Sequence, residues 1–345
     1  MPIPSSGPVA LTDIQTEFGG ANPISLSEYY AGGGLVPAGT TGTFGAVPSS
    51  GTIGIQNFYG VSNISSITIA IGNASLNAAY SLNKGVTWSN STMPSVANWS
   101  ASTYGGGRFV AVSEGSSNKA AYSLNGISWT ASTLPSSGNW PSIAYGNGRF
   151  VTIRNASNSA AYSSDGVTWT ASTLPSNTTW VSIAFGGGRF VAIAINTATA
   201  AYSSDGVSWT LATLPFNTLW RDVAYGGGMF VAVADGAPAA YSSDGINWTS
   251  NFMPSSDTWA SVTYGNGRFV AIAYISNKAA YSTNGINWTT STLPSSLSWI
   301  SIGYGGNFVA VAIGTTENAY SSDGITWSSS SFSSTQSWNA VSGIN

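Results

Sequence analysis

The fourteen tryptophans of this chain form two interleaved series of seven, and this spacing constrains the fold more than any other feature. The first series closes a recurring Tyr-Ser-x-Asp/Asn-Gly phrase, and the second follows 11 residues later each time. A unit repeated seven times, about every 40 residues, is one supersecondary element copied around an axis or along a solenoid. The series are Trp88, Trp129, Trp169, Trp209, Trp248, Trp288 and Trp327, and Trp99, Trp140, Trp180, Trp220, Trp259, Trp299 and Trp338.

Each repeat reads as four short strands. In the copy that begins at Trp180, the segments SIAFG, RFVAIA, AAYSS and the run around VSWTLAT are rich in β-branched and aromatic residues. Gly-x-Gly, a polar stretch, Asp-Gly or Asn-Gly, and a Leu-Pro-Ser connection separate them, and no helical period is present. Glycine and asparagine supply the positive φ values of tight hairpin turns. We therefore predict an all-β fold, a seven-bladed β-propeller over residues 62–345.

The two ends of the repeat region predict a closed ring. The first copy starts at Ser65 with a segment that aligns with RFVAIA, so it lacks the innermost strand. The last copy overruns, because residues 338–345 align with the innermost strand of the other copies. We expect residues 339–344 to pair with residues 65–72, a C-terminal strand closure that removes the exposed edges of an open array. A solenoid has no reason to divide one unit between its ends.

Composition excludes several classes of function. Only 6% of residues are charged, and histidine and cysteine are both absent. The chain therefore lacks thiolates and the commonest general base and metal ligand, and we predict no catalytic residues, no metal site and no cofactor. Nine basic against twelve acidic residues, without a basic run, argue against nucleic acid. No apolar stretch reaches the roughly 20 residues of a membrane span, and the N-terminus does not read as a secretory signal.

Residues 1–61 differ in character and form a predicted small, irregular N-terminal segment. They hold a Pro-Ser-Ser-Gly phrase at Pro4, a second copy at Pro48, and Ser-Leu-Ser-Glu-Tyr-Tyr from Ser25. This order resembles the N-terminal module of structural proteins of tailed bacteriophages, although Gly54-Ile-Gln-Asn departs from the usual Ser-Leu-Ser-Asp. The resemblance implies an anchor to other virion proteins, several copies per particle, and synthesis in the host cytoplasm without a signal peptide. The alternative is a flexible tag or a strand pair that caps the ring.

A second resemblance concerns the turn phrase. Ser81-Leu-Asn-Lys-Gly-Val-Thr-Trp88 resembles the Asp-box of sialidase-like propellers, and the other six copies are one residue shorter. In that family the box is a folding element, so the resemblance implies structural roles for the turn aspartates. Sialidases also use an arginine triad, whereas most arginines here recur in register with the repeat. The turn aspartates are Asp165, Asp205, Asp244 and Asp323, and the in-register arginines are Arg108, Arg149, Arg189 and Arg268.

Residues that break the repeat mark the candidate binding face. The loops between the second and third strands vary between copies, and they lie on the same face as the connections between blades. Side chains that a blade requires should repeat, whereas side chains that face a ligand need not. The alternative is that these differences are loop variation that the fold tolerates and that has no functional role. The candidate ligand-binding residues are Glu114, Arg154, Asn155, Phe216, Arg221, Asp235 and Tyr274.

These observations favour a non-enzymatic phage virion structural protein, a tail, fibre or other particle-surface component. Residues 1–61 would fix the chain to the particle, and the propeller would attach to a host-surface glycan or protein or contact a neighbouring subunit. One alternative is a free, carbohydrate-binding, lectin-like propeller. A second is a degenerate sialidase-like hydrolase, for which the sequence shows no marked pair of carboxylates.

Overall fold

A computed structural model describes residues 14–15, 41–42, 45–46 and 66–344. Ile14 and Gln15 have helical backbone, and β1 (Thr41–Gly42) pairs with β2 (Gly45–Ala46). No helix among the described residues is long and apolar enough to cross a membrane. The predicted N-terminal anchor falls almost wholly outside the described residues, so it stays a prediction.

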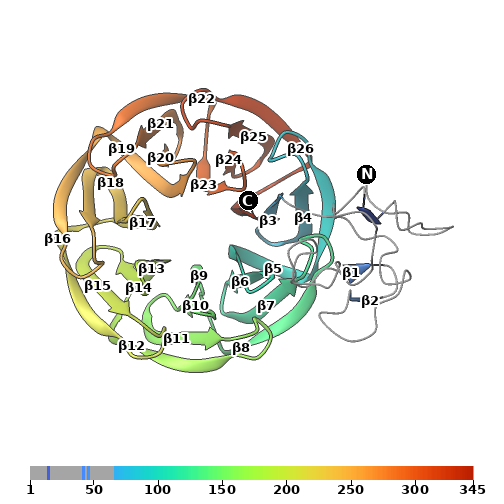
Figure 1. Cartoon of the computed structure of the whole chain (residues 1–345), viewed down its shortest axis with the longest axis horizontal. Helices are drawn as coiled ribbons and strands as arrows, with labels where there is room; N and C mark the ends of the chain where they lie inside the picture. Colours follow the sequence, from blue (N-terminus) through green and yellow to red (C-terminus); the bar gives the residue numbers. More distant parts are fainter. Residues whose placement is uncertain (1–13, 16–40, 43–44, 47–65, 345) are drawn as a thin grey trace.

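The remaining strands build a closed ring of radially arranged antiparallel sheets (Figure 1). The predicted all-β propeller is therefore confirmed. The strands are β3 (Ile67–Gly72), β4 (Ser75–Ser81), β5 (Ser89–Gly105), β6 (Arg108–Glu114), β7 (Ser117–Ser123), β8 (Thr130–Gly138), β9 (Ser142–Gly146), β10 (Arg149–Ile153), β11 (Ser157–Ser163), β12 (Thr170–Thr178), β13 (Trp180–Gly186), β14 (Arg189–Ala194), β15 (Thr197–Ser203), β16 (Thr210–Thr218), β17 (Trp220–Gly226), β18 (Met229–Ser242), β19 (Thr249–Gly265), β20 (Arg268–Ala273), β21 (Ser276–Ser282), β22 (Thr289–Leu297), β23 (Trp299–Tyr304), β24 (Phe308–Ala312), β25 (Thr315–Ser321), β26 (Ser328–Gln336) and β27 (Trp338–Ile344).

Seven blades follow from the strand pairing. Blade 1 is β27-β3-β4-β5, blade 2 is β5-β6-β7-β8, blade 3 is β9 to β12 and blade 4 is β13 to β16. Blade 5 is β17-β18-β19, blade 6 is β19 to β22 and blade 7 is β23 to β26. The long strands β5 and β19 each serve as the outer strand of one blade and the inner strand of the next, and β18 supplies both middle strands of blade 5.

The ring closes as predicted. β27 pairs antiparallel with β3, from Trp338 opposite Gly72 to Ile344 opposite Ile67. The chain's last strand thus becomes the innermost strand of blade 1, and Figure 1 shows the C-terminus beside β3 and β23. Phe332 stacks on Trp338 with ring centroids 3.9 Å apart, which ties the closing strand to blade 7. The shared blade joins the two ends of the repeat region, so no inner strand is missing.

The second tryptophan series forms the buried centre of each blade-to-blade junction. All seven of its side chains are almost fully buried. The indole N–H of Trp180 donates to the carbonyl of Ser176 at 3.2 Å, and that of Trp220 donates to the carbonyl of Phe216 at 3.1 Å. Buried indoles need such an acceptor. The bond recurs in six of the seven copies and fixes the chain segment just before those inner strands, whereas the indole N–H of Trp338 has no such partner.

One local expectation is corrected. The Leu-Pro-Ser segment was predicted as a connection, but it belongs to the outer strand, as in β16, which contains Leu214, Pro215 and Phe216. The pairing with β15 shifts register between Thr197 and Thr199, so the segment bulges. Proline is tolerated because the fourth strand is a sheet edge, where a missing N–H breaks no ladder.

The turn aspartates have the structural role that the sequence predicted. Asp165 Oδ1 accepts hydrogen bonds from the backbone N–H groups of Val167 and Thr168, at 2.9 and 2.8 Å, and from the Ser163 hydroxyl. Burial alone would raise the pKa of Asp165, but these hydrogen bonds hold it below its ordinary value. The same bonds recur in the other Asp and Asn turns, so they define the hairpin rather than a binding site.

Candidate functional site

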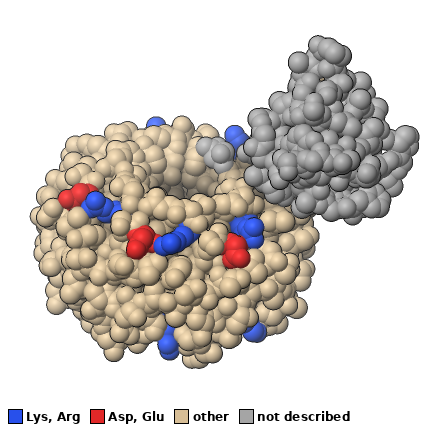
Figure 2. All heavy atoms as spheres, turned by 60° about the horizontal axis from the view of Figure 1, so that its bottom comes forward, with Lys and Arg blue, Asp and Glu red and all other residues tan. Residues whose placement is uncertain are grey.

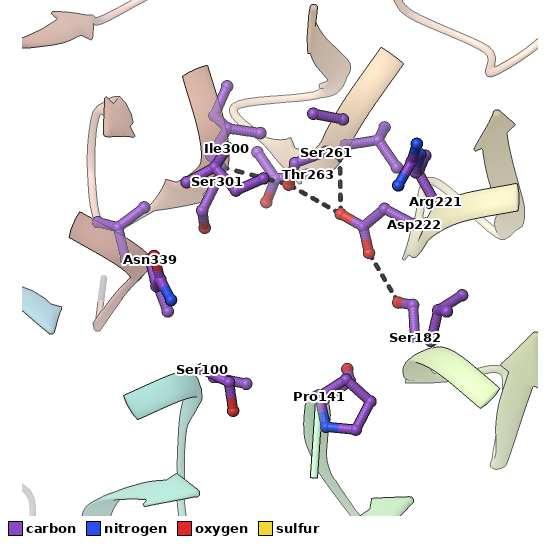
Figure 3. A pocket seen from close by; sticks show the side chains of 18 of the residues that line it. Ser100, Pro141, Ser182, Arg221, Asp222, Ser261, Thr263, Ile300, Ser301 and Asn339 are labelled. Carbon is purple, nitrogen blue, oxygen red and sulfur yellow. Dashed lines mark hydrogen bonds between the residues drawn. The ribbon is translucent and has the colours of Figure 1, made fainter. Parts of the chain in front are cut away.

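A cavity of about 620 Å³ occupies the centre of the ring, where the inner strands meet (Figure 3). Its lining includes the residue that follows the buried tryptophan in every blade. We call these seven residues the mouth ring. The backbone at these positions repeats, yet the side chains range from hydroxyl and amide to aliphatic and guanidinium. The mouth ring is Ser100, Pro141, Val181, Arg221, Ala260, Ile300 and Asn339.

A second ring of variable side chains lies where the second strand of each blade ends. We call it the loop ring. Its backbone is nearly constant, because the N–H of Ile195 donates to Thr179 at 2.9 Å, and the same bond recurs from Asp235 to Leu219 at 3.0 Å. Identical backbone with unlike side chains is how a scaffold presents a specific surface. The loop ring is Asn73, Glu114, Asn155, Ile195, Asp235, Tyr274 and Ile313.

The opposite face, with the Gly-x-Gly and Asp turns, is built from repeated contacts. The guanidinium of Arg149 lies 5.3 Å from the ring centroid of Tyr162 and donates to the carbonyl of Asp205 at 2.7 Å in the next blade. Arg189 repeats this arrangement with Tyr202 and Asp244. These arginines therefore join blades, as the sequence predicted.

Arg221 links the two rings. Its Nε and Nη2 donate to the two carboxylate oxygens of Asp235, both at 2.7 Å. A bidentate pair of this kind fixes the guanidinium plane. The hydrogen bond that Arg221 donates to Asp235 raises the pKa of Arg221 above its ordinary value, more than burial lowers it. Two predicted site residues thus act as one unit, and Asp235 already occupies two of the guanidinium donors.

Tyr274 faces a smaller recess beside the mouth, with a volume of about 280 Å³. Ile300 and Ile313 supply aliphatic walls, and Arg221 borders both this recess and the central cavity. An aromatic ring beside aliphatic groups and a few polar ones is typical of a small-molecule subsite. The lining of the recess is Arg221, Thr258, Ala260, Tyr274, Ile300 and Ile313.

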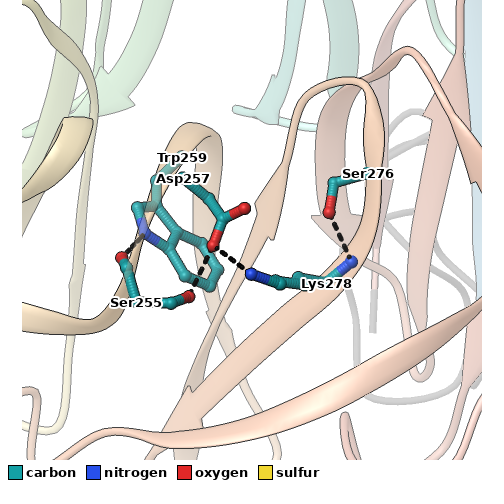
Figure 4. Close-up of polar contacts among 5 residues, drawn as sticks. All are labelled: Ser255, Asp257, Trp259, Ser276 and Lys278. Atoms are coloured by element: carbon teal, nitrogen blue, oxygen red, sulfur yellow. Dashed lines mark hydrogen bonds and ion pairs between the residues drawn. The ribbon is translucent and has the colours of Figure 1, made fainter.

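The loop that carries Tyr274 is braced by an ion pair (Figure 4). Lys278 Nζ lies 2.9 Å from Asp257 Oδ2, and the Ser255 hydroxyl donates to the same oxygen at 2.6 Å. Ser255 in turn accepts the indole N–H of Trp259 on its carbonyl at 3.1 Å. The brace couples the loop to the buried tryptophan, so Tyr274 is presented on an ordered support. Charges are sparse on the face shown in Figure 2, where some Lys and Arg groups lie beside an Asp or Glu and others lie alone.

Four predicted residues line neither cavity: Asp235, which reaches the mouth through its pair with Arg221, and three residues that lie further out. Phe216 packs against Phe252, with ring centroids 5.6 Å apart, and against Trp220. Arg154 covers Gly138, since a Cβ there would meet Arg154 Nε at 2.1 Å. Asn155 donates its backbone N–H to Asn139 but does not line the cavity. The structure brings Glu114, Arg221, Asp235 and Tyr274 around the mouth, and places these three further out on the same face.

Asp222 was not among the predicted site residues, yet it lies in the central cavity. Four donors surround its carboxylate: the hydroxyls of Ser182 and Ser261, at 2.7 and 2.8 Å, and the N–H groups of Val223 and Val262, both at 2.9 Å (Figure 3). It joins blades 4, 5 and 6. Because every lone pair in the plane is occupied, Asp222 is poorly placed as a general base or metal ligand.

The sequence did hold a signal for Asp222. The aligned residue is a serine in four other copies, Ser142, Ser182, Ser261 and Ser301. There the serine Oγ accepts an N–H from the next blade, as Ser142 does from Ile183 at 3.1 Å. A carboxylate at this column bridges two serines at once, which a serine cannot do. Aligning the repeats does set Asp222 apart from these serines, but the sequence alone does not show which side chains it contacts.

Burial raises the pKa of Asp222 above its ordinary value, and its four hydrogen bonds offset this only in part. A raised folded-state pKa means that the folded protein gains stability from this group at low pH and loses it as pH rises through the folded pKa. We therefore expect wild type to lose stability relative to Asp222→Ser as pH rises above about 4, the ordinary pKa of an aspartate. Urea unfolding at a series of pH values measures this difference. The turn aspartates are present in both proteins, so their contribution to the pH dependence cancels in the difference between wild type and Asp222→Ser. A difference that stays constant with pH would contradict the assignment.

The remaining carboxylate of the cavity is Glu114. No hydrogen bond or ion pair within the described part of the chain engages it, and burial raises its pKa. Among the described residues, no three acidic side chains gather as a metal site requires. The site is therefore a polar cavity with one unengaged carboxylate and one engaged guanidinium.

The fold is similar to that of virginiamycin B lyase from Staphylococcus aureus, solved with Quinupristin as a catalytically inactive histidine-to-alanine variant. That similarity has a TM-score of 0.62 at 12% identity and covers 77% of this chain and 89% of the lyase chain. A streptogramin B lyase gives 0.61 at 11% identity, covering 68% and 83%. YCF48 bound to a D1 peptide gives 0.54 at 18% identity, covering 69% and 82%. No protein-family model and no curated protein matches the chain.

This comparison overturns one prediction. The sequence was interpreted as that of a protein without enzymatic activity, but propellers similar to this one include lyases, which are enzymes. The fold is thus shared by enzymes and by a protein solved with a bound peptide. Identities of 11–18% show the fold alone, so they assign neither a reaction nor a partner to this chain.

Proposed function

We propose that this chain is a recognition propeller that binds a surface saccharide at the mouth of its central cavity. One observation carries the proposal: two rings of seven side chains that vary between blades stand on repeated backbone at one face, whereas the other face repeats its contacts. If the variable face served only the ring, its side chains would have no reason to differ from blade to blade.

The chemistry of the mouth suits a polyhydroxylated ligand. Asn339 offers an amide, and Ser100, whose hydroxyl donates to the Trp140 carbonyl at 2.7 Å, can still accept a hydrogen bond. Tyr274 offers an aromatic surface next to the aliphatic wall of Ile300. Sugars bind through such a combination of apolar stacking and directed polar contacts. Each contact is weak, so affinity for a surface would depend on several copies acting together.

The phage-type N-terminal phrases supply the setting for this proposal. We propose that residues 1–61 attach the chain to a virion in several copies and that the propeller faces the host cell. The chain would then be a tail, fibre or other surface component that contributes to host attachment. Loss of the protein from particles after deletion of residues 1–61, with the propeller still folded, would support this arrangement.

The lyase comparison does not extend to its reaction. The inactive lyase variant lost a histidine, and this chain contains no histidine. A streptogramin-type cleavage that depends on a histidine therefore has no counterpart among these side chains.

The face is tested by two substitutions. We expect Tyr274→Ala to lower binding to isolated host envelopes about tenfold, because it removes a stacking surface without touching the repeat. Arg149→Ala on the opposite face should leave binding unchanged and lower the unfolding temperature, because it breaks an inter-blade contact. Binding is measured below both unfolding temperatures. Binding that survives Tyr274→Ala and fails with Arg149→Ala would place the site on the other face.

A further inference from the structure

Glu114 is held in place by an ordered loop. It is the last residue of β6 and pairs with Asn98 of β5. Gly115 and Ser116 follow in the left-handed region, with φ of 83° and 57°, and their N–H groups both donate to Asn139 Oδ1, at 2.8 and 3.1 Å. Since a serine adopts this backbone only at some energetic cost, the clamp by Asn139 is what stabilises the turn. The backbone from which the Glu114 side chain borders the cavity is therefore ordered.

This carboxylate has no partner among the described residues. It is half-buried, and no described residue donates a hydrogen bond or forms an ion pair to it. The other two acids near the mouth are engaged, Asp222 by four donors and Asp235 by Arg221. A partly desolvated carboxylate without a partner is unfavourable in the free protein, and a cationic partner relieves that cost.

The charge around the mouth also has a definite sign. Arg221 is paired with Asp235, which leaves the carboxyl groups of Glu114 and Asp222 in the cavity without a cationic partner among the described residues. Asp235 already neutralises that guanidinium, so the cavity offers no free cation to a carboxylate or phosphate ligand. Such a cavity attracts cations and repels anions.

We infer that the saccharide bound at the mouth carries a free amine, and that Glu114 accepts the hydrogen bonds of its ammonium group. This inference rests on the proposed function and names the ligand class of the same site. The hydroxyl and amide groups of the mouth ring would hold the sugar ring, and Glu114 would select the amine. Acidic sugars are disfavoured, in contrast to the ligands that a sialidase-like site requires.

The test uses the full-length protein and pairs of oligosaccharides that differ only at nitrogen. Calorimetric titration compares chitosan hexamer, which bears free amines, with fully N-acetylated chitin hexamer, and with oligogalacturonate as the acidic probe. We expect wild type to prefer chitosan by about tenfold or more and Glu114→Gln to lose that preference, because one charge-assisted hydrogen bond is removed. The matched control is Glu317→Gln, at a glutamate that is engaged by Ser295 and does not line the cavity.

The outcomes separate this inference from the proposed function. Equal binding of chitosan and chitin that Tyr274→Ala abolishes would overturn the role of Glu114 and leave the saccharide site standing. Binding of neither hexamer, while envelope binding still requires Tyr274, would overturn the amine inference. A lysine hexapeptide that binds as tightly as chitosan would overturn the saccharide class. A preference for chitosan that survives Glu114→Gln but not Glu317→Gln would place the amine elsewhere.

Discussion

Deleting residues 338–345 is expected to destabilise the whole propeller by at least about 4 kcal/mol. The deletion removes β27, and with it Trp338, which is 1% exposed, and the buried Ala340 and Val341. Loss of one buried tryptophan alone costs roughly 3–5 kcal/mol. It also strips the partner from β3, whose residues are all buried, and leaves an open edge at the centre of the ring. Thermal unfolding followed by tryptophan fluorescence measures the effect.

A shorter deletion provides the control. Removing residues 344–345 takes away only the pair at the strand's end, Ile344 opposite Ile67, and keeps the stacked Phe332 and Trp338. We expect the unfolding temperature of this variant to stay within a few degrees of wild type. If the long deletion unfolds at the wild-type temperature, then β27 does not close the ring.

The architecture was predictable because a repeat amplifies a weak local signal. A single four-stranded unit carries ambiguous patterns, but seven aligned copies separate the positions that a blade needs from the positions that vary. The closure followed from counting strands at the two ends of the repeat region, Ile67 at one and Trp338 at the other. The prediction at Pro215 was wrong for a different reason. A proline usually indicates the end of a strand, and it is compatible with a strand only where that strand is a sheet edge, which the sequence did not show.

The site was predictable only in part. Loop variation pointed to Glu114 and Tyr274, and the structure places both at cavities, although their role in binding stays a prediction. The sequence of a single repeat does not show which side chains touch across neighbouring blades, because the two partners lie in different repeats, as Asp222 and Ser261 do. The same limit explains Arg154, which stands out in the sequence but covers Gly138 instead of the cavity. Depth along the strand, rather than departure from the repeat, decides whether a side chain reaches the cavity.

Gly186→Ala is expected to destabilise the protein by on the order of 3 kcal/mol or more. A Cβ at Gly186 would lie 1.9 Å from the ring of Tyr225 in the next blade, and Gly226 meets Tyr264 at the same distance. Each aromatic ring thus lies directly on a glycine of the preceding blade, and no rotation of the ring removes the overlap at its Cγ atom. Urea unfolding of the single variant measures the cost.

A double variant shows whether the cost comes from this contact. Tyr225→Ala alone removes a packed ring, but combined with Gly186→Ala it also removes the clash. The free energy of unfolding lost in the double variant should therefore be smaller than the sum of the two single losses by more than about 1 kcal/mol. Gly314→Ala is the control, since nothing lies within 4 Å of its Cβ position and only its φ of 72° opposes alanine, at roughly 1–2 kcal/mol. Additive costs at Gly186 and Tyr225 would mean that the ring-on-glycine contact does not set the spacing between blades.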